Sequence, residues 1–263
     1  MATLAMGKRE VWRKLLHSRI VVFAPHPDDE VIGALSILSC HPANSFLIFV
    51  TDGAPLRLGP KRAALQSQRR KESECLAELL ALPRTHIVRF DLSDQEASYQ
   101  LPLLIQRVQT LLCEIAPDVV IIPAYEGGHP DHDSTAFAVH RAAGLLGTNA
   151  PDLVEMALYH SRDGSMATGE FLNGRISKDA LTVALSLRER RLKQRAYHIY
   201  SSQAEVLKYF PISCERFRAA PRYDFLSAPH RGKLFYENFD WNVSGTGWRR
   251  LAKQAISHHE DHF

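Results

Sequence analysis

Two clusters of histidine and aspartate, each placed directly after a run of apolar residues, constrain the fold of this chain most strongly. The first apolar run is Ile20–Phe23, and the sequence APHPDDE follows it at residues 24–30. The second run is Val119–Pro123, followed by GGHPDHD at residues 127–133. Short runs rich in β-branched residues predict buried strands, and a helical pattern follows each cluster. In an open α/β sheet, such strand-to-helix turns lie at the carboxyl ends of the strands, where ligands bind.

Strand and helix patterns alternate through the first half of the chain. Further strands are predicted at Phe46–Thr51 and His86–Phe90, and helices at Lys61–Leu82 and Leu101–Ile115. This alternation predicts right-handed crossovers and an α/β fold with a mostly parallel sheet flanked by helices. If the strand order is doubly wound, the first and fourth strands are neighbours and the two clusters face one crevice.

The pattern is less regular at the two ends of the chain. We expect a short lead-in helix at Val11–Leu16, a strand at Leu153–His160, a helix at Ala180–Tyr197 and a final helix at Trp248–Ile256. Within that second helix, the basic run Arg188–Arg195 is expected to be a solvated face, with contact to an anionic group as the alternative.

Length and composition favour a single domain. A chain of 263 residues with 45% apolar residues can bury a full core. We therefore predict one domain over residues 1–263. Residues 1–150 would form its regular α/β core, and residues 151–263 an irregular C-terminal extension that completes it.

Charge and cysteine content exclude several classes of protein. The net charge is +3, from 32 basic and 29 acidic residues, so no overall field favours nucleic acid or an anionic membrane as partner. No apolar run reaches the roughly 18 residues that span a bilayer, and the N-terminus lacks a signal-peptide core. The cysteines show no paired spacing, which predicts reduced thiols and a cytoplasmic protein of undetermined oligomeric state. They are Cys40, Cys75, Cys113 and Cys214.

The first cluster suits a divalent metal. One histidine and three carboxylates within five residues would repel one another unless a cation joined them. The alternative is that Asp28, Asp29 and Glu30 only cap a helix, and the presence of a second cluster favours the metal. A catalytic zinc site usually has three protein ligands and one water. His26, Asp29 and one histidine of the second cluster supply that number.

The remaining residues of the clusters supply acid and base groups. Asp28 would neighbour the metal-bound water and accept its proton, and the other histidine of the second cluster would stabilise an oxyanion or protonate a leaving nitrogen. These groups fit hydrolysis of an amide or ester. A two-metal phosphoesterase remains an alternative because Asp131 and Asp133 add carboxylates, and a non-catalytic sugar-binding protein is a third reading. No glycine-rich phosphate loop follows the first strand.

The paired motifs at residues 24–30 and 129–133 resemble those of the PIG-L/LmbE family of metal-dependent N-acetylglucosaminyl deacetylases. The resemblance continues through further short matches along nearly the whole chain. They are Thr51–Gly53, Arg69 with Glu72, Ser202–Gln203, and Leu234–Glu237 with Trp241. One departure is Pro25, which stands where the family usually has alanine.

This resemblance implies a Rossmann-like fold and an N-acetylated amino sugar as substrate. It also implies Zn²⁺ bound by His26, Asp29 and His132, with another divalent metal such as Fe²⁺ as an alternative. Asp28 would be the general base, and His129 the oxyanion stabiliser or acid.

Substrate contacts are expected from two further residues. The resemblance implies one from Arg69, and the turn Asp52–Pro55 after the second strand is expected to form a rim of the site, with Asp52 as a contact. Some family members place a tyrosine close before the second motif, where this chain has Tyr125. The aromatic residues Phe235–Trp241 are expected to be core, with a wall against a sugar ring as the alternative.

Overall fold

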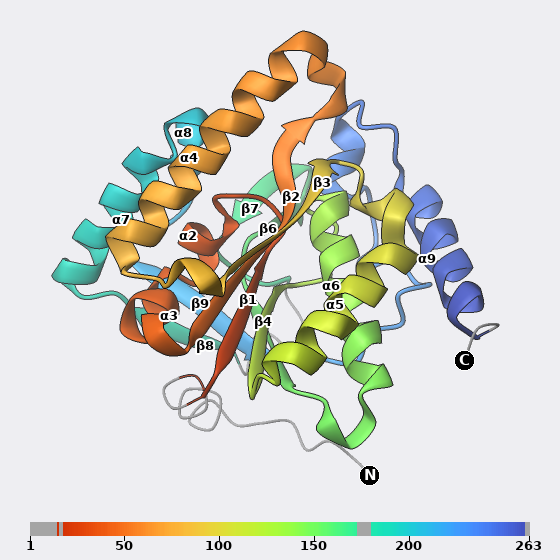
Figure 1. The fold of residues 1–263 in the computed structure, drawn as a ribbon. Helices are drawn as coiled ribbons and strands as arrows, with labels where there is room; N and C mark the ends of the chain where they lie inside the picture. Colours follow the sequence, from red (N-terminus) through yellow and green to blue (C-terminus); the bar gives the residue numbers. More distant parts are fainter. Residues whose placement is uncertain (1–14, 16–17, 173–179, 261–263) are drawn as a thin grey trace.

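A seven-stranded, mostly parallel sheet forms the centre of the protein in the computed structural model, which describes Leu15, residues 18–172 and residues 180–260 (Figure 1). The strand order is β3-β2-β1-β4-β5-β9-β8. The first five strands in the chain pair in parallel, whereas β9 runs antiparallel to both of its neighbours. The α/β fold expected from the sequence is thereby confirmed. The strands of this sheet are β1 (Ile20–Ala24), β2 (Ser45–Pro55), β3 (Ile87–Asp94), β4 (Val119–Pro123), β5 (Asp152–Met156), β8 (Leu181–Ala184) and β9 (Cys214–Ala219).

Helices cover both faces of the sheet (Figure 1). On one face lie α2 (Asp29–Gly33), α3 (Leu35–Cys40), α4 (Arg62–Leu80), α7 (Leu187–Ile199) and α8 (Ala204–Leu207). On the other lie α5 (Leu101–Ile115), α6 (Pro130–Leu145) and α9 (Gly245–Glu260). No helix in the described part of the chain is both long and apolar enough to cross a membrane.

The position of strand β1 between two layers of helices explains why all of its residues are apolar. Val22 and Ala24 pack into the core on the α4 face, whereas Val21 and Phe23 pack into the core on the α5 face. Successive side chains of a strand point to opposite faces, so a strand covered by helices on both sides has no solvated side. All five residues of β1 are buried.

The position of β1 beside β4 brings the two clusters together. These strands pair in parallel, with Ile20 opposite Val119 and Val22 opposite Ile121. The chain first builds β2 and β3 on one side of β1 and then returns to build β4 on the other side. The adjacency expected from a doubly wound order is confirmed, and the loops that follow both strands open at the same edge of the sheet.

The region after residue 150 differs from expectation at two places. The predicted strand Leu153–His160 is two strands, β5 and β6 (Tyr159–Arg162), and β6 forms a separate hairpin with β7 (Ser165–Thr168). The chain leaves the sheet at Ala157, whose N–H donates to the Arg216 carbonyl of β9.

The predicted helix Ala180–Tyr197 is wrong in its first part. Residues 181–184 form β8, since the edge of β9 offers backbone partners that the local pattern does not reveal. Helix α7 starts only after Ser186, which forms a capping box with Glu189. The expected lead-in helix Val11–Leu16 lies outside the described residues except for Leu15.

The basic run on α7 is solvated only in part. Arg188, Arg191 and Arg195 are exposed. Lys193 is fully buried, and its Nζ lies 2.9 Å from Glu215 Oε1 of β9 and donates to the Ile32 carbonyl at the end of α2. Lys193 thus connects the C-terminal region to α2, the helix that begins within the first cluster.

Candidate active site

The first cluster forms a tight loop between β1 and α2. The His26 N–H donates to Asp29 Oδ2 at 2.9 Å, and the Asp28 N–H donates to Glu30 Oε2 at 2.9 Å. Asp28 has φ 140° and ψ −25°, which L-residues rarely adopt. The loop therefore turns back on itself, and Asp28 and Asp29 both line the same cavity.

The second cluster begins helix α6. His129 caps the helix, because its Nδ1 accepts a hydrogen bond from the Asp131 N–H at 3.1 Å. Gly127 has φ +69°, and its N–H donates to Asp133 Oδ1 at 3.1 Å. A Cβ at Gly128 would lie 2.1 Å from the Tyr159 carbonyl oxygen, so only glycine fits there. Both glycines are needed to place His129 and His132 at the sheet edge.

His26, Asp29 and His132 converge as a buried set of candidate metal ligands. Asp29 Oδ2 lies 3.2 Å from His26 Nδ1 and 3.2 Å from His132 Nε2, and the ligand atoms of all three lie within 4.8 Å of one another. His132 Nε2 is buried and makes no hydrogen bond of good geometry with any described residue. Two imidazoles and a carboxylate are ligands that zinc uses in catalytic sites. The residues present therefore fit a zinc ion, which would complete the coordination of His132 Nε2.

A second buried set overlaps the first at His26. His26 Nε2 lies 3.2 Å from Asp94 Oδ1 and 3.1 Å from Asp131 Oδ2, and His129 Nε2 lies 3.7 Å from Asp94 Oδ1. These four residues also place ligand atoms within 4.8 Å of one another. Asp131 additionally accepts hydrogen bonds from the Gln95 and Ala97 backbone N–H groups, which fix its orientation.

The electrostatics of the site reflect an excess of carboxylates in a buried space. Burial disfavours the charged form of His26, but Asp94, Asp131 and Asp29 outweigh it and raise the pKa of His26 well above its usual value. Burial would likewise raise the pKa of Asp29, yet His132 and His26 hold it well below its usual range. A group of carboxylates that keeps a proton on a buried histidine favours a cation there.

Asp28 and His129 have shifted pKa values for different reasons. Burial raises the pKa of Asp28 to about 7, although Arg69 opposes the shift. Burial and the neighbouring His26 lower the pKa of His129 well below its usual value, so the imidazole is neutral. Because Nδ1 of His129 accepts a hydrogen bond, its proton lies on Nε2.

Arg69 is buried against Asp28 rather than exposed on the outer face of α4. Its Nη2 lies 3.2 Å from Asp28 Oδ2, and its Nη1 donates to the Gly53 carbonyl at 2.9 Å. Arg69 lines the cavity with the two clusters. A guanidinium in this place fixes the Asp28 carboxylate and can reach a ligand.

Asp52 does not line that cavity. Its Oδ2 accepts hydrogen bonds from Gln66 and Arg62, and its Oδ1 accepts one from the Ala54 N–H at 2.9 Å. A substrate contact from Asp52 stays a prediction, and its present contacts stabilise the loop after β2.

A cavity of about 120 Å³ joins these groups, and several of its lining residues were not assigned from the sequence. Asp94 lies beyond the predicted strand His86–Phe90, at the end of β3, and an acid at the carboxyl end of a parallel strand is a usable signal. Tyr159 and Phe210 had no local signal. The lining residues are His26, Asp28, Asp29, Ile32, Arg69, Asp94, His129, His132, Tyr159, Gln203, Val206 and Phe210.

Two aromatic residues pack on the histidines. The Tyr159 ring meets His132 with centroids 5.1 Å apart, and the Trp241 ring meets His129 at 4.7 Å. Tyr125 instead points away, since its hydroxyl donates to the Ser227 carbonyl at 3.0 Å. Of the C-terminal aromatic stretch expected to be core, Trp241 therefore contacts the site directly.

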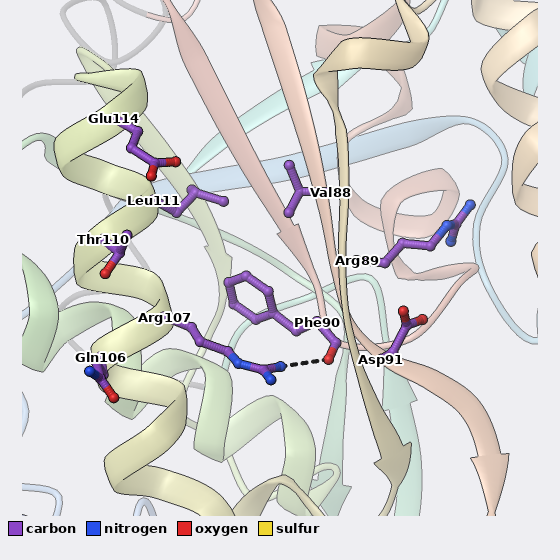
Figure 2. Close-up of a pocket in the computed structure, with 9 residues that line it drawn as sticks. All are labelled: Val88, Arg89, Phe90, Asp91, Gln106, Arg107, Thr110, Leu111 and Glu114. Carbon is purple, nitrogen blue, oxygen red and sulfur yellow. Dashed lines mark hydrogen bonds between the residues drawn. The ribbon is translucent and has the colours of Figure 1, made fainter.

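A larger hollow of about 750 Å³ lies elsewhere, between edge strand β3 and helix α5. Figure 2 shows Arg107 reaching toward β3, where its Nη1 donates to the Phe90 carbonyl at 2.7 Å, while Arg89 points to the other side of the strand. None of the nine residues lining it is a histidine or cysteine. Size alone therefore does not mark the active site of this protein.

The fold and the two clusters define an α/β protein with a buried histidine and aspartate site suited to a divalent metal. The family model described as PIG-L, GlcNAc-PI de-N-acetylase, matches residues 21–143, a stretch that contains both clusters. This match confirms the resemblance inferred from the motifs over residues 21–143. No curated protein matches the chain in a sequence comparison.

Solved structures share the fold at low sequence identity. The N,N'-diacetylchitobiose deacetylase from Pyrococcus horikoshii has a TM-score of 0.56 and 20% identity, over 84% of this chain and 94% of that one. A deacetylase of the teicoplanin biosynthesis pathway has a TM-score of 0.59 and 17% identity, over 78% and 99%. The 4-carboxy-2-hydroxymuconate hydratase from Pseudomonas putida KT2440 has a TM-score of 0.52 and 14% identity, over 78% and 97%. Because one fold serves deacetylases and a hydratase, the activity must be argued from the site.

Proposed function

We propose that the protein is a zinc-dependent hydrolase that removes the N-acetyl group from an N-acetylglucosamine-type amino sugar conjugate. The observation that carries the proposal is the convergence of His26, Asp29 and His132, with Asp28 and His129 on the same cavity. The family match to a GlcNAc-PI de-N-acetylase supports the substrate class. The free cysteines are consistent with action in the cytoplasm.

His26, Asp29 and His132 would hold the zinc ion. When bound, zinc supplies a Lewis acid and lowers the pKa of a coordinated water from 15.7 to about 7. The three ligand residues are buried, with His26 in the loop after β1, Asp29 at the start of α2 and His132 in the first turn of α6. Rigid placement of reacting groups is a main source of catalytic rate.

Asp28 is the general base. Arg69 holds one of its oxygens, and its pKa of about 7 allows it to accept a proton from the attacking water at neutral pH. The same proton is then available for the amine that leaves when the C–N bond breaks. The products are acetate and the free amino sugar.

His129 lines the same cavity as this base. It is neutral and carries its proton on Nε2, so it can donate a hydrogen bond to the oxygen that becomes negative as water attacks the amide carbon. Trp241 packs on the ring and limits its rotation. The hydrogen bond from the Asp131 N–H fixes the tautomer.

A two-metal phosphoesterase is the second candidate. The overlapping set of His26, Asp94, His129 and Asp131 is the observation that favours it, since paired metal sites share ligands. This reading predicts two metals per chain and release of phosphate from a simple phosphate ester. A sugar-binding protein without turnover would bind N-acetylglucosamine conjugates and release no acetate.

Metal content and acetate release test the proposal together. We expect about one zinc per chain and zinc-dependent acetate release from N-acetylglucosamine conjugates. Asp28→Ala should retain zinc and lower turnover by about 10²- to 10⁴-fold. Glu114→Ala, which removes an exposed carboxylate on α5, is the control and should leave turnover unchanged. Undiminished turnover in Asp28→Ala would remove the base assignment, and two metals with phosphate release would favour the second candidate.

A further inference from the structure

Asp28 is held in a backbone conformation that an aspartate does not adopt by itself. Its φ of 140° brings the Cβ close to its own backbone, a conformation in which glycine is favoured. Such a residue persists only where the surrounding structure forces it, and strained residues of this kind concentrate at functional sites. Contacts to both the backbone and the side chain of Asp28 must therefore supply the force.

The backbone of Asp28 is held by Glu30. The Asp28 N–H donates to Glu30 Oε2 at 2.9 Å, and the other oxygen of Glu30 accepts a short hydrogen bond from the Tyr200 hydroxyl. Glu30 and Tyr200 are both fully buried. Tyr200 follows the last residue of α7, so a residue far along the chain fixes the orientation of the Glu30 carboxylate.

The side chain of Asp28 is held from another direction. Arg69 pairs with its carboxylate and also donates to the Pro27 carbonyl at 2.5 Å. Glu30 does not line the cavity and belongs to neither candidate metal set among the described residues. Both oxygens of its carboxylate accept hydrogen bonds, one from the Asp28 N–H and one from the Tyr200 hydroxyl.

We infer that Glu30 and Tyr200 are positioning residues, a buried pair that clamps the Asp28 N–H and so keeps the strained residue aimed into the cavity. The inference rests on the proposed function only in that Asp28 is taken as the base. The clamp itself is a property of the fold. Removing Glu30 lets the Asp28 backbone relax, and the carboxylate then leaves its place beside the metal ligands.

Strain at residue 28 gives a test that needs no activity. In the wild-type background, Asp28→Gly should melt about 2–4 °C above Asp28→Ala, because glycine tolerates φ 140° and alanine does not. In a Glu30→Ala background the two variants should melt within about 1 °C of each other, since the backbone is then free to relax. The same difference in both backgrounds would overturn the inference.

Turnover and metal content give the second test. Glu30→Ala should lower kcat about 100-fold, with KM within about twofold and zinc content unchanged, because a misplaced base affects the chemical step. Glu30→Gln keeps an acceptor for the Asp28 N–H and should recover most of kcat. Tyr200→Phe removes only the hydroxyl and should lower kcat about tenfold. If Glu30→Ala does not fold, the result for Tyr200→Phe still decides the test.

Ser36→Ala, which removes a buried hydrogen bond between α3 and β9, is the matched control. Ser36 donates to Glu215 and does not contact Asp28. It should lower the melting temperature without a fall in kcat. Equal kcat losses in Ser36→Ala and Tyr200→Phe would mean a general structural effect and overturn the inference. If the wild-type protein releases no acetate, the proposed function fails, and the melting comparison still decides whether the clamp exists.

Discussion

His132 Nε2 lies 3.2 Å from Asp29 Oδ2, although the two residues lie in the first turns of different helices after different strands. The contact exists because β1 and β4 are neighbours in the sheet. Apart from this close approach, His132 Nε2 makes no hydrogen bond of good geometry within the described part of the chain, which is costly for a buried ring nitrogen. A metal bridging this pair would remove that cost.

Metal binding should therefore stabilise the fold. With zinc at about 100 times its Kd, we expect a melting temperature about 5–10 °C above that of the chelator-treated protein. In His132→Ala the difference should disappear, and in His198→Ala, which changes an exposed histidine on α7, it should persist. Differential scanning calorimetry with and without chelator measures this. An unchanged difference in His132→Ala would place the metal elsewhere.

A methyl group at Gly53 should disturb Arg69. The added Cβ would lie 2.5 Å from the Arg69 guanidinium, and Gly53 also has φ +66°. We expect Gly53→Ala to lower the free energy of unfolding by about 1–3 kcal/mol and turnover by at least about tenfold, since Asp28 loses its partner. Urea titration and steady-state kinetics measure the two effects.

Gly59→Ala is the matched control for that variant. Gly59 has φ +52°, but a Cβ there meets no atom within 4 Å. The backbone strain should cost about 1 kcal/mol, and turnover should stay unchanged. Equal losses of turnover in the two variants would show that backbone strain, and not the displacement of Arg69, is responsible.

Trp241 should influence the chemical step through His129. The two rings lie 4.7 Å apart, and Trp241 also stacks on Phe239 at 4.5 Å. We expect Trp241→Ala to lower kcat about tenfold with zinc content unchanged, because the His129 ring gains freedom. Phe239→Ala removes a ring that does not touch His129 and should have a smaller effect. Pre-steady-state acetate release separates this step from product release.

His140 should contribute to acid sensitivity. Burial lowers its pKa to about 4, from 6.5 for an unperturbed histidine. Between these values the unfolded chain binds a proton that the folded protein excludes, so this contribution is complete above pH 6.5 and is lost as the pH falls toward 4.

The variant His140→Phe tests this effect. It should reduce the loss of unfolding free energy between about pH 7.5 and pH 5 by about 1–2 kcal/mol. Urea titrations of both proteins at the two pH values measure the change. A loss as large as that of the wild type would show that His140 takes up its proton in the folded state as well.

Much of the core was predictable from local patterns. The fully apolar runs at β1 and β4 predicted buried strands, and α5 begins and ends at the residues expected. The ends of these strands placed both clusters at one edge of the sheet. By contrast, β8 was mistaken for the start of a helix, because its pairing with β9 depends on a strand more than 30 residues further along the chain.

The site was predictable in part for the same reason. His26, Asp28, Asp29, His129 and His132 were marked by their spacing after two strands, and all five line one cavity. Asp94 required knowledge that β3 ends beside the same crevice, and Tyr159 enters from a hairpin outside the main sheet. Asp52, expected to contact substrate, accepts hydrogen bonds from Arg62 and Gln66 instead. No local sequence pattern reveals these two partners.

The sequence by itself determined the class of fold and the chemical character of the site, since strand periodicity and the His/Asp spacing are local properties. The tertiary structure alone decided which side chains surround those groups. Tyr200 reaches Glu30 from α7, and Trp241 reaches His129 from the C-terminal region. Such contacts depend on strand order and on packing between distant segments, and their hydrogen bonds become strong only where burial excludes water.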